Sequence, residues 1–320
     1  MAAPNLTLSN GKKIPSFGLG TFEVEDKRRS IGDAVKDAID AGYRLIDTAS
    51  VYNSEGLVGE GVRAKIAEGV IKREDMFIVT KLWNNRHDCE NVVPACKESL
   101  KCLGLDYIDL YLMHWPMAYP AHAEGIWPVD EKGNPLTTDM DYVETWKAME
   151  ECVNLGLVKS IGVSNFNAEQ LDRVLAIAKI KPVVNQIECH VKLNQKKLRA
   201  FCGEKGILTM AYSPLGAPGY NWRSDRTDTN HVGDVPVIQA IADKYGKSSA
   251  QVTLKYLLEI GTIPIPKSIS TERIRQNIDI FDFKLTPEDM ASIDKLDCGY
   301  RVCEAAPYKN HKYYPFHAEF

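Results

Sequence analysis

The chain has no hydrophobic run long enough to cross a membrane and no secretion signal at its start. No stretch reaches the roughly 18 consecutive apolar residues of a membrane-spanning helix. Residues 1–7 lack both the charged start and the apolar centre of a signal peptide. We therefore expect a cytoplasmic protein without a membrane partner. The sequon Asn5-Leu6-Thr7 is interpreted as coincidental, because N-glycosylation requires secretion.

Cysteine pairs with metal or redox spacing are also missing. The eight cysteines are widely spaced with no C-x-x-C pair, and a chain of 320 residues does not need disulfides to hold its core together. We expect eight free thiols. Cys189 and His190 are adjacent but point to opposite faces of a predicted strand, and the remaining histidines lack ligand spacing. We expect no metal site.

The glycine patterns of two common nucleotide-binding folds are incomplete. A Rossmann fold needs G-x-G-x-x-G after its first strand, but Gly18-Leu19-Gly20 continues as Thr-Phe-Glu, without the third glycine. Gly246-Lys247-Ser248 resembles the end of a phosphate-binding P-loop, but Ile241 stands where the first glycine belongs. We interpret residues 240–245 as helix and Gly246 as its end. An open, doubly wound sheet is therefore disfavoured.

No charge of one sign dominates the chain. The 39 basic and 43 acidic residues give a net charge of −4, and the basic residues are scattered. Nucleic-acid binding is disfavoured, since it usually requires a basic cluster. With 44% hydrophobic and 26% charged residues, the composition is typical of a soluble globular protein.

Short apolar runs alternate with amphipathic stretches along the chain. An opening hairpin is predicted, with Asn10-Gly11 suited to a type I′ turn. Each later run is followed by a helix-like segment, such as Asp26 to Ala41. The eight runs are residues 17–21, 44–48, 77–81, 108–114, 159–164, 183–188, 207–213 and 262–268. Eight strand–helix units predict a (β/α)8 TIM barrel.

Three long segments rich in aromatics, proline and glycine interrupt this rhythm: 115–141, 215–235 and 297–320. The first two follow predicted strands, so we expect them at the C-terminal rim, where barrel active sites lie. They are predicted to form pocket walls. No linker or further repeat is visible, and we expect one domain over residues 1–320.

Four polar residues stand at or just after the ends of consecutive runs. Asp47, Lys81 and His114 close their runs, and Tyr52 follows Asp47 by five positions. Because the carboxyl ends of parallel barrel strands share one mouth, we expect these side chains to be neighbours. Each alone is more often a turn, surface or structural residue, but together they predict proton delivery to a substrate oxygen. Lys81 would lower the phenol pKa from about 10, and Asp47 would hold the ammonium.

Ordered segments along nearly the whole chain resemble the aldo-keto reductase family, in particular the animal aldose and aldehyde reductases. The matching segments are Gly18-Leu19-Gly20-Thr21, Asp47-Thr48-Ala49-x-x-Tyr52, Thr80-Lys81-Leu82-Trp83, Leu112-Met113-His114-Trp115-Pro116, Ile161-Gly162-Val163-Ser164-Asn165-Phe166, Asn185-Gln186, Ala211-Tyr212-Ser213-Pro214-Leu215-Gly216, Ile265-Pro266-Lys267-Ser268 and His311-Lys312-Tyr313-Tyr314-Pro315-Phe316-His317.

The resemblance implies an NADPH-dependent enzyme in which Tyr52 is the general acid, Lys81 and Asp47 tune it, and His114 orients the carbonyl. NADPH would be bound without a Rossmann motif. The residues implied around it are Gly20, Thr21, Phe22, Asp47, Ser164, Asn165, Gln186, Tyr212, Ser213, Leu215, Lys267, Ser268, Ile269, Arg273, Gln276 and Asn277. Of these, Ser164, Asn165 and Gln186 would bind the carboxamide and Tyr212 would stack on the nicotinamide. Lys267, Ser268 and Arg273 would hold the 2′-phosphate.

The implied substrate pocket is lined by Phe22, Tyr52, Trp83, His114, Trp115, Trp222, Tyr300 and Cys303. Two positions depart from the family pattern. Phe22 replaces a tryptophan of the best-known relatives, which weakly favours apolar or bulky carbonyls, and Gln276 replaces a glutamate found in many. His114 indicates carbonyl reduction, because relatives that reduce steroid double bonds usually carry glutamate there.

The expected activity is therefore reduction of aldehydes and ketones to alcohols by a monomer that binds a small carbonyl substrate. Three alternatives remain at this stage: a specialised steroid or ecdysteroid ketone reductase, a non-catalytic binding or structural protein on the same scaffold, and a hydrolase that uses Asp47 with Glu188. The intact set of four polar residues argues against loss of activity.

Overall fold

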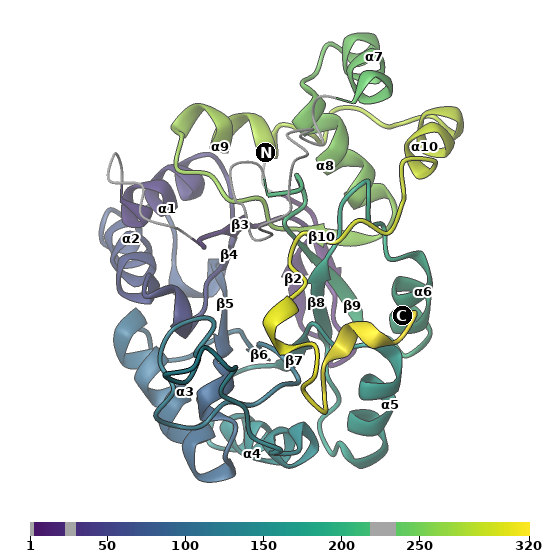
Figure 1. Cartoon of the computed structure of the whole chain (residues 1–320). Helices are drawn as coiled ribbons and strands as arrows, with labels where there is room; N and C mark the ends of the chain where they lie inside the picture. Colours follow the sequence, from purple (N-terminus) through teal and green to yellow (C-terminus); the bar gives the residue numbers. More distant parts are fainter. Residues whose placement is uncertain (1–2, 23–29, 218–234) are drawn as a thin grey trace.

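Eight parallel strands form the centre of the molecule, and helices surround them (Figure 1). This computed structural model describes residues 3–22, 30–217 and 235–320. The strands follow one another around the sheet in chain order. They are β3 (Leu19–Gly20), β4 (Leu45–Asp47), β5 (Phe77–Leu82), β6 (Leu110–Met113), β7 (Ile161–Ser164), β8 (Val184–Glu188), β9 (Leu208–Tyr212) and β10 (Thr262–Pro264).

Backbone hydrogen bonds between the first and last strands close the sheet. The amide of Gly18 donates to the oxygen of Pro264, and that of Gly20 to the oxygen of Pro266, each over 3.1 Å. Gly20 also pairs in parallel with Lys267. The predicted (β/α)8 barrel is thus confirmed.

The helices that cover the barrel mostly begin at the polar caps their sequences provide. Ser30 caps the first helix, which starts at Ile31. The predicted start at Asp26 lies outside the described residues. The helix before Gly246 ends there as predicted, with that glycine in the left-handed region at φ 63°. The helices are α1 (Ile31–Asp40), α2 (Glu55–Ala67), α3 (Cys89–Leu103), α4 (Tyr142–Asn154), α5 (Ala168–Ile177), α6 (Lys196–Glu204), α7 (Pro236–Tyr245), α8 (Ser249–Glu259), α9 (Thr271–Ile278) and α10 (Pro287–Asp294).

Strand alternation decides which side chains enter the barrel. In β5, Phe77 and Val79 belong to the interior apolar cluster, whereas Ile78 and Leu82 pack outward among the helices. Because the side-chain period of a strand is two, Lys81 must point inward, two positions after Val79. It is completely buried.

The same alternation applies to the neighbouring strands. Asp47 follows interior Leu45 by two positions, and His114 follows interior Leu112 by two. The barrel interior is therefore apolar through its middle and becomes polar at the carboxyl ends of the strands. This polar layer is the base of the functional site.

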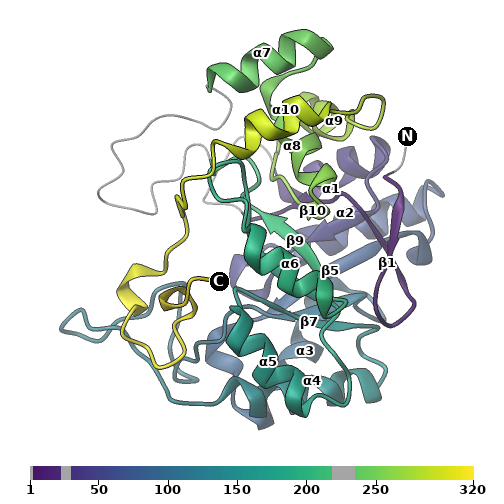
Figure 2. The ribbon, with the colours of Figure 1, turned by 90° about the vertical axis from the view of Figure 1, so that its right-hand side faces the viewer.

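The N-terminal hairpin closes the opposite end of the barrel. Strands β1 (Asn5–Thr7) and β2 (Lys13–Pro15) pair antiparallel, and Leu8 and Ile14 join the interior cluster from below. Figure 2 shows the hairpin and the yellow C-terminal segment at opposite ends of the molecule.

The turn of this hairpin differs from the prediction. A type I′ turn needs positive φ at both central residues, but Gly11 has a φ of 82° and Asn10 is not among the residues with positive φ. The amide of Gly11 donates to the oxygen of Leu8, so the turn spans residues 8–11 and ends in a left-handed glycine.

Two of the three predicted rim segments meet over the mouth of the barrel. Trp115 and Tyr119 of the first pack with Ala305 and Tyr308 of the C-terminal segment in one apolar cluster. The remaining rim segment, residues 215–235, lies largely outside the described residues. None of the described helices is long and apolar enough to span a membrane.

Gly162→Ala is predicted to destabilise the barrel. A Cβ at this position of β7 would lie 2.6 Å from the oxygen of Val184 and 2.8 Å from a methyl group of Leu112. Overpacking of this kind lowers the free energy of unfolding by about 1–3 kcal/mol. The matched control is Gly203→Ala in α6, where a Cβ meets nothing within 4 Å. This substitution should raise the free energy of unfolding by up to ~1 kcal/mol. Urea unfolding measures both; equal effects would contradict the packing argument.

Candidate active site

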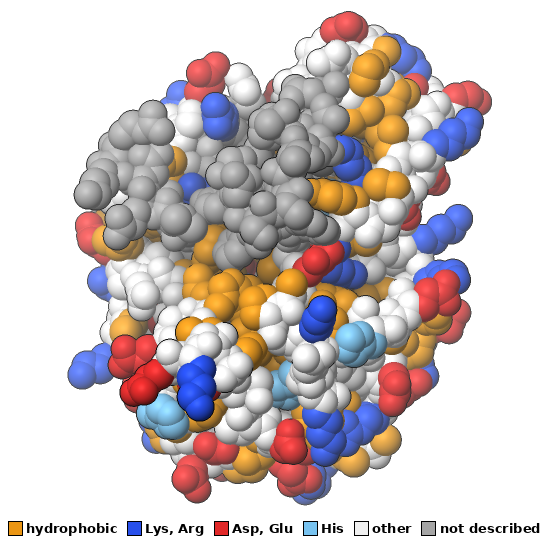
Figure 3. All heavy atoms as spheres, viewed as in Figure 1, with side chains coloured by type: hydrophobic (Ala, Val, Ile, Leu, Met, Phe, Trp, Pro, Cys, Tyr) orange, Lys and Arg blue, Asp and Glu red, His pale blue; other side chains and the backbone are white. Residues whose placement is uncertain are grey.

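A cavity of about 560 Å³ opens at the carboxyl ends of the strands. Figure 3 shows hydrophobic side chains gathered near the middle of this face. Most of the residues predicted for cofactor or substrate line it. These are Gly20, Thr21, Phe22, Asp47, Tyr52, Trp83, His114, Trp115, Ser164, Asn165, Gln186, Tyr212, Ser213, Leu215, Lys267, Ser268, Ile269, Arg273 and Cys303.

Several predicted residues do not line the cavity. Tyr300 instead contacts Lys192: its amide donates to the oxygen of Lys192 over 3.1 Å, and the Lys192 ammonium lies over its ring. Gln276 and Asn277 lie further along α9 than Arg273; the former pairs with Glu272 and the latter is buried. Trp222 lies outside the described residues.

Further side chains that the sequence did not single out also line the cavity. The additional residues are Val51, Ile126, Trp127, Pro214, Ala217, Ile265, Pro266 and Ser270. Ile126 and Trp127 belong to the rim segment 115–141, which was predicted to form a pocket wall, but nothing in the sequence showed which of its side chains turn inward.

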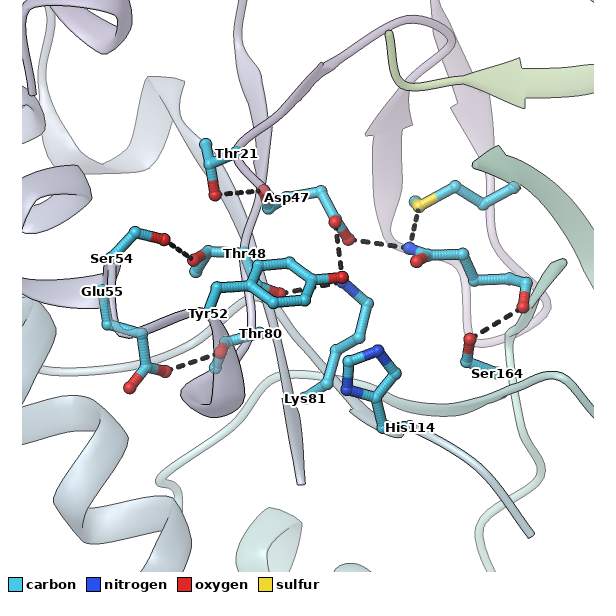
Figure 4. Close-up of polar contacts among 12 residues, drawn as sticks. Thr21, Asp47, Thr48, Tyr52, Ser54, Glu55, Thr80, Lys81, His114 and Ser164 are labelled. Carbon is cyan, nitrogen blue, oxygen red and sulfur yellow. Dashed lines mark hydrogen bonds and ion pairs between the residues drawn. The ribbon is translucent and has the colours of Figure 1, made fainter. Parts of the chain in front are cut away.

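Lys81 contacts two of the other three polar residues at the floor of the cavity. Its ammonium donates to Oδ1 of Asp47 over 2.6 Å, and to the hydroxyl of Tyr52 over 3.4 Å. Figure 4 shows the Tyr52 hydroxyl beside this ammonium, with the His114 ring close by. The centroids of the Tyr52 and His114 rings are 5.7 Å apart. The predicted convergence of all four groups is thus present in the structure.

Burial controls the protonation of these groups. It raises the pKa of Asp47 and lowers that of Lys81, while their mutual contact opposes both shifts. Burial and the charges of Asp47 and Cys303 raise the pKa of Tyr52 well above 10. The expected net fall in the Tyr52 pKa is therefore absent, since the 3.4 Å contact with the Lys81 ammonium does not offset burial.

His114 is held as a neutral imidazole. Burial, and then the charge of Lys81 and the nearby His87, lower its pKa well below 6.5. The Trp83 ring lies 4.9 Å from the imidazole and packs against it edge to face. A neutral imidazole can donate a hydrogen bond to a substrate oxygen without adding a charge.

A second polar band runs across the ends of β7, β8 and β9. Gln186 donates to Oδ2 of Asp47 over 2.7 Å, which ties this band to the proton-delivery set. Tyr212 donates to Oδ1 of Asn165 over 2.8 Å, and Nδ2 of Asn165 donates to Oγ of Ser164 over 3.2 Å. Asn165 is held at φ 62°, a left-handed conformation that asparagine tolerates better than most residues.

The part of the cavity that follows β10, which we call the basic end, is rich in cations and hydroxyl groups. Lys267, Ser268, Ser270 and Arg273 line it. Ser270 also caps α9, its side chain accepting from the amide of Arg273. Cations beside a helix N-terminus form a suitable environment for a phosphate group.

The alternative pairing of Asp47 with Glu188 is not supported. The oxygens of Glu188 accept hydrogen bonds from Val302 and Cys303 backbone amides and from His190, and Glu188 does not line the cavity. All eight cysteines are free thiols, as predicted. Within the described residues, no group of three or more His, Cys, Asp and Glu side chains is arranged to hold a metal ion.

Comparison with known proteins shows that most of the chain is similar to members of one family. The model of the Aldo/keto reductase family matches residues 16–298. The chain is 44% identical over 317 residues to "Aldo-keto reductase AKR2E4" of Bombyx mori, covering 98% of each protein. It is 43% identical over 316 residues to "Estradiol 17 beta-dehydrogenase 5" of Mus musculus, covering 98% of this chain and 97% of the relative.

Two solved structures superpose closely on the chain. The Bombyx mori AKR2E4 structure, a complex with NADP, gives a TM-score of 0.87 and covers 98% of this chain and 99% of its own. The aldose reductase of Schistosoma japonicum, 38% identical, gives a TM-score of 0.91 and covers 99% and 100%.

His114 is predicted to titrate well below pH 6.5, and Lys81→Met should raise its pKa, because one of the charges that lowers it is removed. Since the folded-state pKa is depressed, protonation favours the unfolded chain, and this group's contribution to stability is lost as pH falls below 6.5. NMR titration of the imidazole nitrogens measures the pKa. Lys65→Met, in α2 among Asp40 and Glu68, is the control and should leave it unchanged. A lower pKa in Lys81→Met would refute the assignment.

Proposed function

The chain belongs to the aldo/keto reductase family, and on that basis we propose that it reduces aldehydes or ketones to alcohols with NADPH. The observation that carries the proposal is the convergence of Asp47, Tyr52, Lys81 and His114 at a cavity that is also lined by Lys267 and Arg273. The NADP bound to the Bombyx mori relative supports the choice of cofactor.

The basic end of the cavity fits the phosphate that distinguishes NADPH from NADH. Lys267 and Arg273 supply two cations, and Ser268 supplies a hydroxyl. Charge-assisted hydrogen bonds to a phosphate dianion are among the stronger polar contacts in proteins. The guanidinium of Arg273 can bind two phosphate oxygens at once. We propose that these residues hold the 2′-phosphate.

The polar band fits a nicotinamide. The side-chain nitrogen of Gln186 donates to Asp47 and to the sulfur of Met210, so the side-chain oxygen can accept from a carboxamide. Asn165 and Ser164 complete the carboxamide contacts, and the Tyr212 ring provides a stacking face at the same wall. These four residues belong to or directly follow β7, β8 and β9, and Lys267 follows β10, the next strand of the barrel, which supports a dinucleotide bound along the cavity.

When bound, NADPH supplies the hydride that the carbonyl carbon accepts. Tyr52 holds the proton for the oxygen, because its raised pKa keeps the phenol protonated. The phenolate left after transfer would lie beside the ammonium of Lys81, whose orientation Asp47 fixes at 2.6 Å. The neutral imidazole of His114 donates a hydrogen bond to the carbonyl oxygen and orients it.

Aromatic side chains form much of the substrate end. Phe22, Trp83, Trp115 and Trp127 line the cavity; the centroid of the Phe22 ring lies 4.9 Å from that of Tyr52, and that of Trp83 lies 4.9 Å from that of His114. We propose apolar or bulky carbonyls as substrates, with aldehydes in general as the first candidate and steroid ketones as the second. The relative named for estradiol favours the second. Initial rates with short aldehydes, aromatic aldehydes and steroid ketones will distinguish them.

We further propose that the protein acts as a cytoplasmic monomer and as one domain over residues 1–320. The balanced charge of −4 supports a small-molecule partner over a nucleic acid. Light scattering coupled to gel filtration tests the monomer, and a dimer would overturn it.

Tyr52→Phe is predicted to abolish most of the activity. Loss of a positioned general acid lowers kcat by about 10²–10⁴-fold. NADPH affinity should stay near that of the wild type, because the ring is retained. The loss of NADPH absorbance measures turnover, and quenching of tryptophan fluorescence measures binding. Wild-type turnover by the variant would overturn the role of Tyr52, and a wild type that reduces no carbonyl would overturn the proposed function.

Arg273→Ala is predicted to weaken NADPH binding and leave NADH binding nearly unchanged. Hydrogen bonds to a charged group contribute about 1.5–3 kcal/mol, equivalent to roughly a tenfold to hundredfold change in Kd. Arg275→Ala on the same helix is the control, because Arg275 is exposed and does not line the cavity. Equal losses for the two cofactors would contradict the phosphate assignment.

A further inference from the structure

Glu188, the last residue of β8, is a completely buried carboxylate that the proposed chemistry does not use. We propose that Glu188 is a positioning residue: it fixes the C-terminal tail, residues 297–320, where the tail closes the substrate end of the cavity, and so helps to set which carbonyls bind productively. The inference rests on the proposed function for its consequence, but not for the anchoring itself.

Both oxygens of Glu188 hold the tail by its backbone. Oε1 accepts from the amide of Val302 over 2.6 Å, and Oε2 accepts from the amide of Cys303 over 2.7 Å. His190 contacts Oε1 over 2.9 Å. One carboxylate at the end of a barrel strand therefore accepts hydrogen bonds from two adjacent amides of the tail. Hydrogen bonds to an ionised acceptor are about twice as strong as neutral ones.

The surroundings of Glu188 keep it ionised. Burial raises its pKa, but contacts with His190, the charge of Arg301 and the amide of Val302 outweigh burial and lower it overall. A protonated carboxyl group would turn one acceptor into a donor. The negative charge is thus the form that holds two amides at once.

The strand that carries Glu188 is itself braced at this point. The side chain of Gln195 donates to the backbone oxygen of Glu188 over 3.1 Å. Four residues beyond Glu188, the backbone oxygen of Lys192 accepts from the amides of Cys298 and Tyr300 over 3.2 Å and 3.1 Å. The tail is therefore attached to one short segment, 188–192, before it reaches the cavity.

The anchored residues lead directly into the substrate wall. Cys303 lines the cavity, while Ala305 and Tyr308 pack in the apolar cluster with Trp83 and Trp115. A shift of the two amides displaces this wall, while Asp47, Lys81 and Tyr52 are held by contacts of their own. Substrates with a large apolar body contact the wall, whereas a short aldehyde occupies the floor.

The test is Glu188→Gln, which preserves shape but presents one oxygen and an NH₂ group to two amide donors. We expect KM for a bulky aromatic or steroid ketone to rise about tenfold, the factor that corresponds to about 1.4 kcal/mol of lost binding. Its kcat, the KM of a short aldehyde and the Kd of NADPH should stay close to wild type. Hydrogen exchange at Val302 and Cys303 should accelerate.

Glu150→Gln is the matched control. Glu150 in α4 is also buried, and its Oε1 accepts from the backbone amides of Lys179 and Ile180 over 2.6 Å and 2.8 Å, but it does not line the cavity. This substitution should leave both KM values unchanged. The comparison separates positioning of the substrate wall from a general loss of a buried carboxylate.

Equal changes in KM for short and bulky carbonyls in Glu188→Gln would overturn the proposal. So would fast exchange of the Val302 and Cys303 amides in the wild type, a measurement that needs no variant to fold. A wild type that reduces no carbonyl would refute the proposed function alone, because slow exchange at these amides would still establish the anchor.

Discussion

The ion pair between Lys81 and Asp47, buried on the floor of the barrel mouth, is the interaction on which the site depends. Its 2.6 Å contact holds an ammonium against a tyrosine hydroxyl in a region where an unpaired charge would be strongly unfavourable. Removing one partner of such a pair costs about 3–5 kcal/mol, because the other charge is left buried. The pair therefore serves reactivity at a cost that the rest of the fold must offset.

The geometry of the barrel places this ion pair. Strand alternation fills the middle of the barrel with apolar side chains such as Val79 and Leu112, and it brings Lys81 and His114 to the same polar layer above them. Gln186 then joins this layer to the proposed nicotinamide wall through Asp47. Proton delivery and cofactor binding are thus physically linked through one carboxylate.

The floor of the site can be predicted from the sequence, but not all of its walls can. Asp47, Lys81 and His114 were found because strand ends must share one mouth, a consequence of topology that needs no coordinates. Tyr300 was assigned to the pocket and Trp127 was missed, because the path of a long rim segment depends on contacts between distant residues, such as that of Glu188 with Val302. The rise in the Tyr52 pKa was missed as well, since burial and the length of the Lys81 contact are not written in the sequence.

The proposed chemistry requires Lys81 to promote the reaction by acting on Tyr52. A double-mutant cycle in kcat with Tyr52→Phe, Lys81→Met and the double variant tests it most directly, because residues that act as one unit show strongly non-additive effects. We expect the double variant to be no slower than Tyr52→Phe alone. If the two losses multiply, Lys81 acts independently of the phenol, and the claim is contradicted.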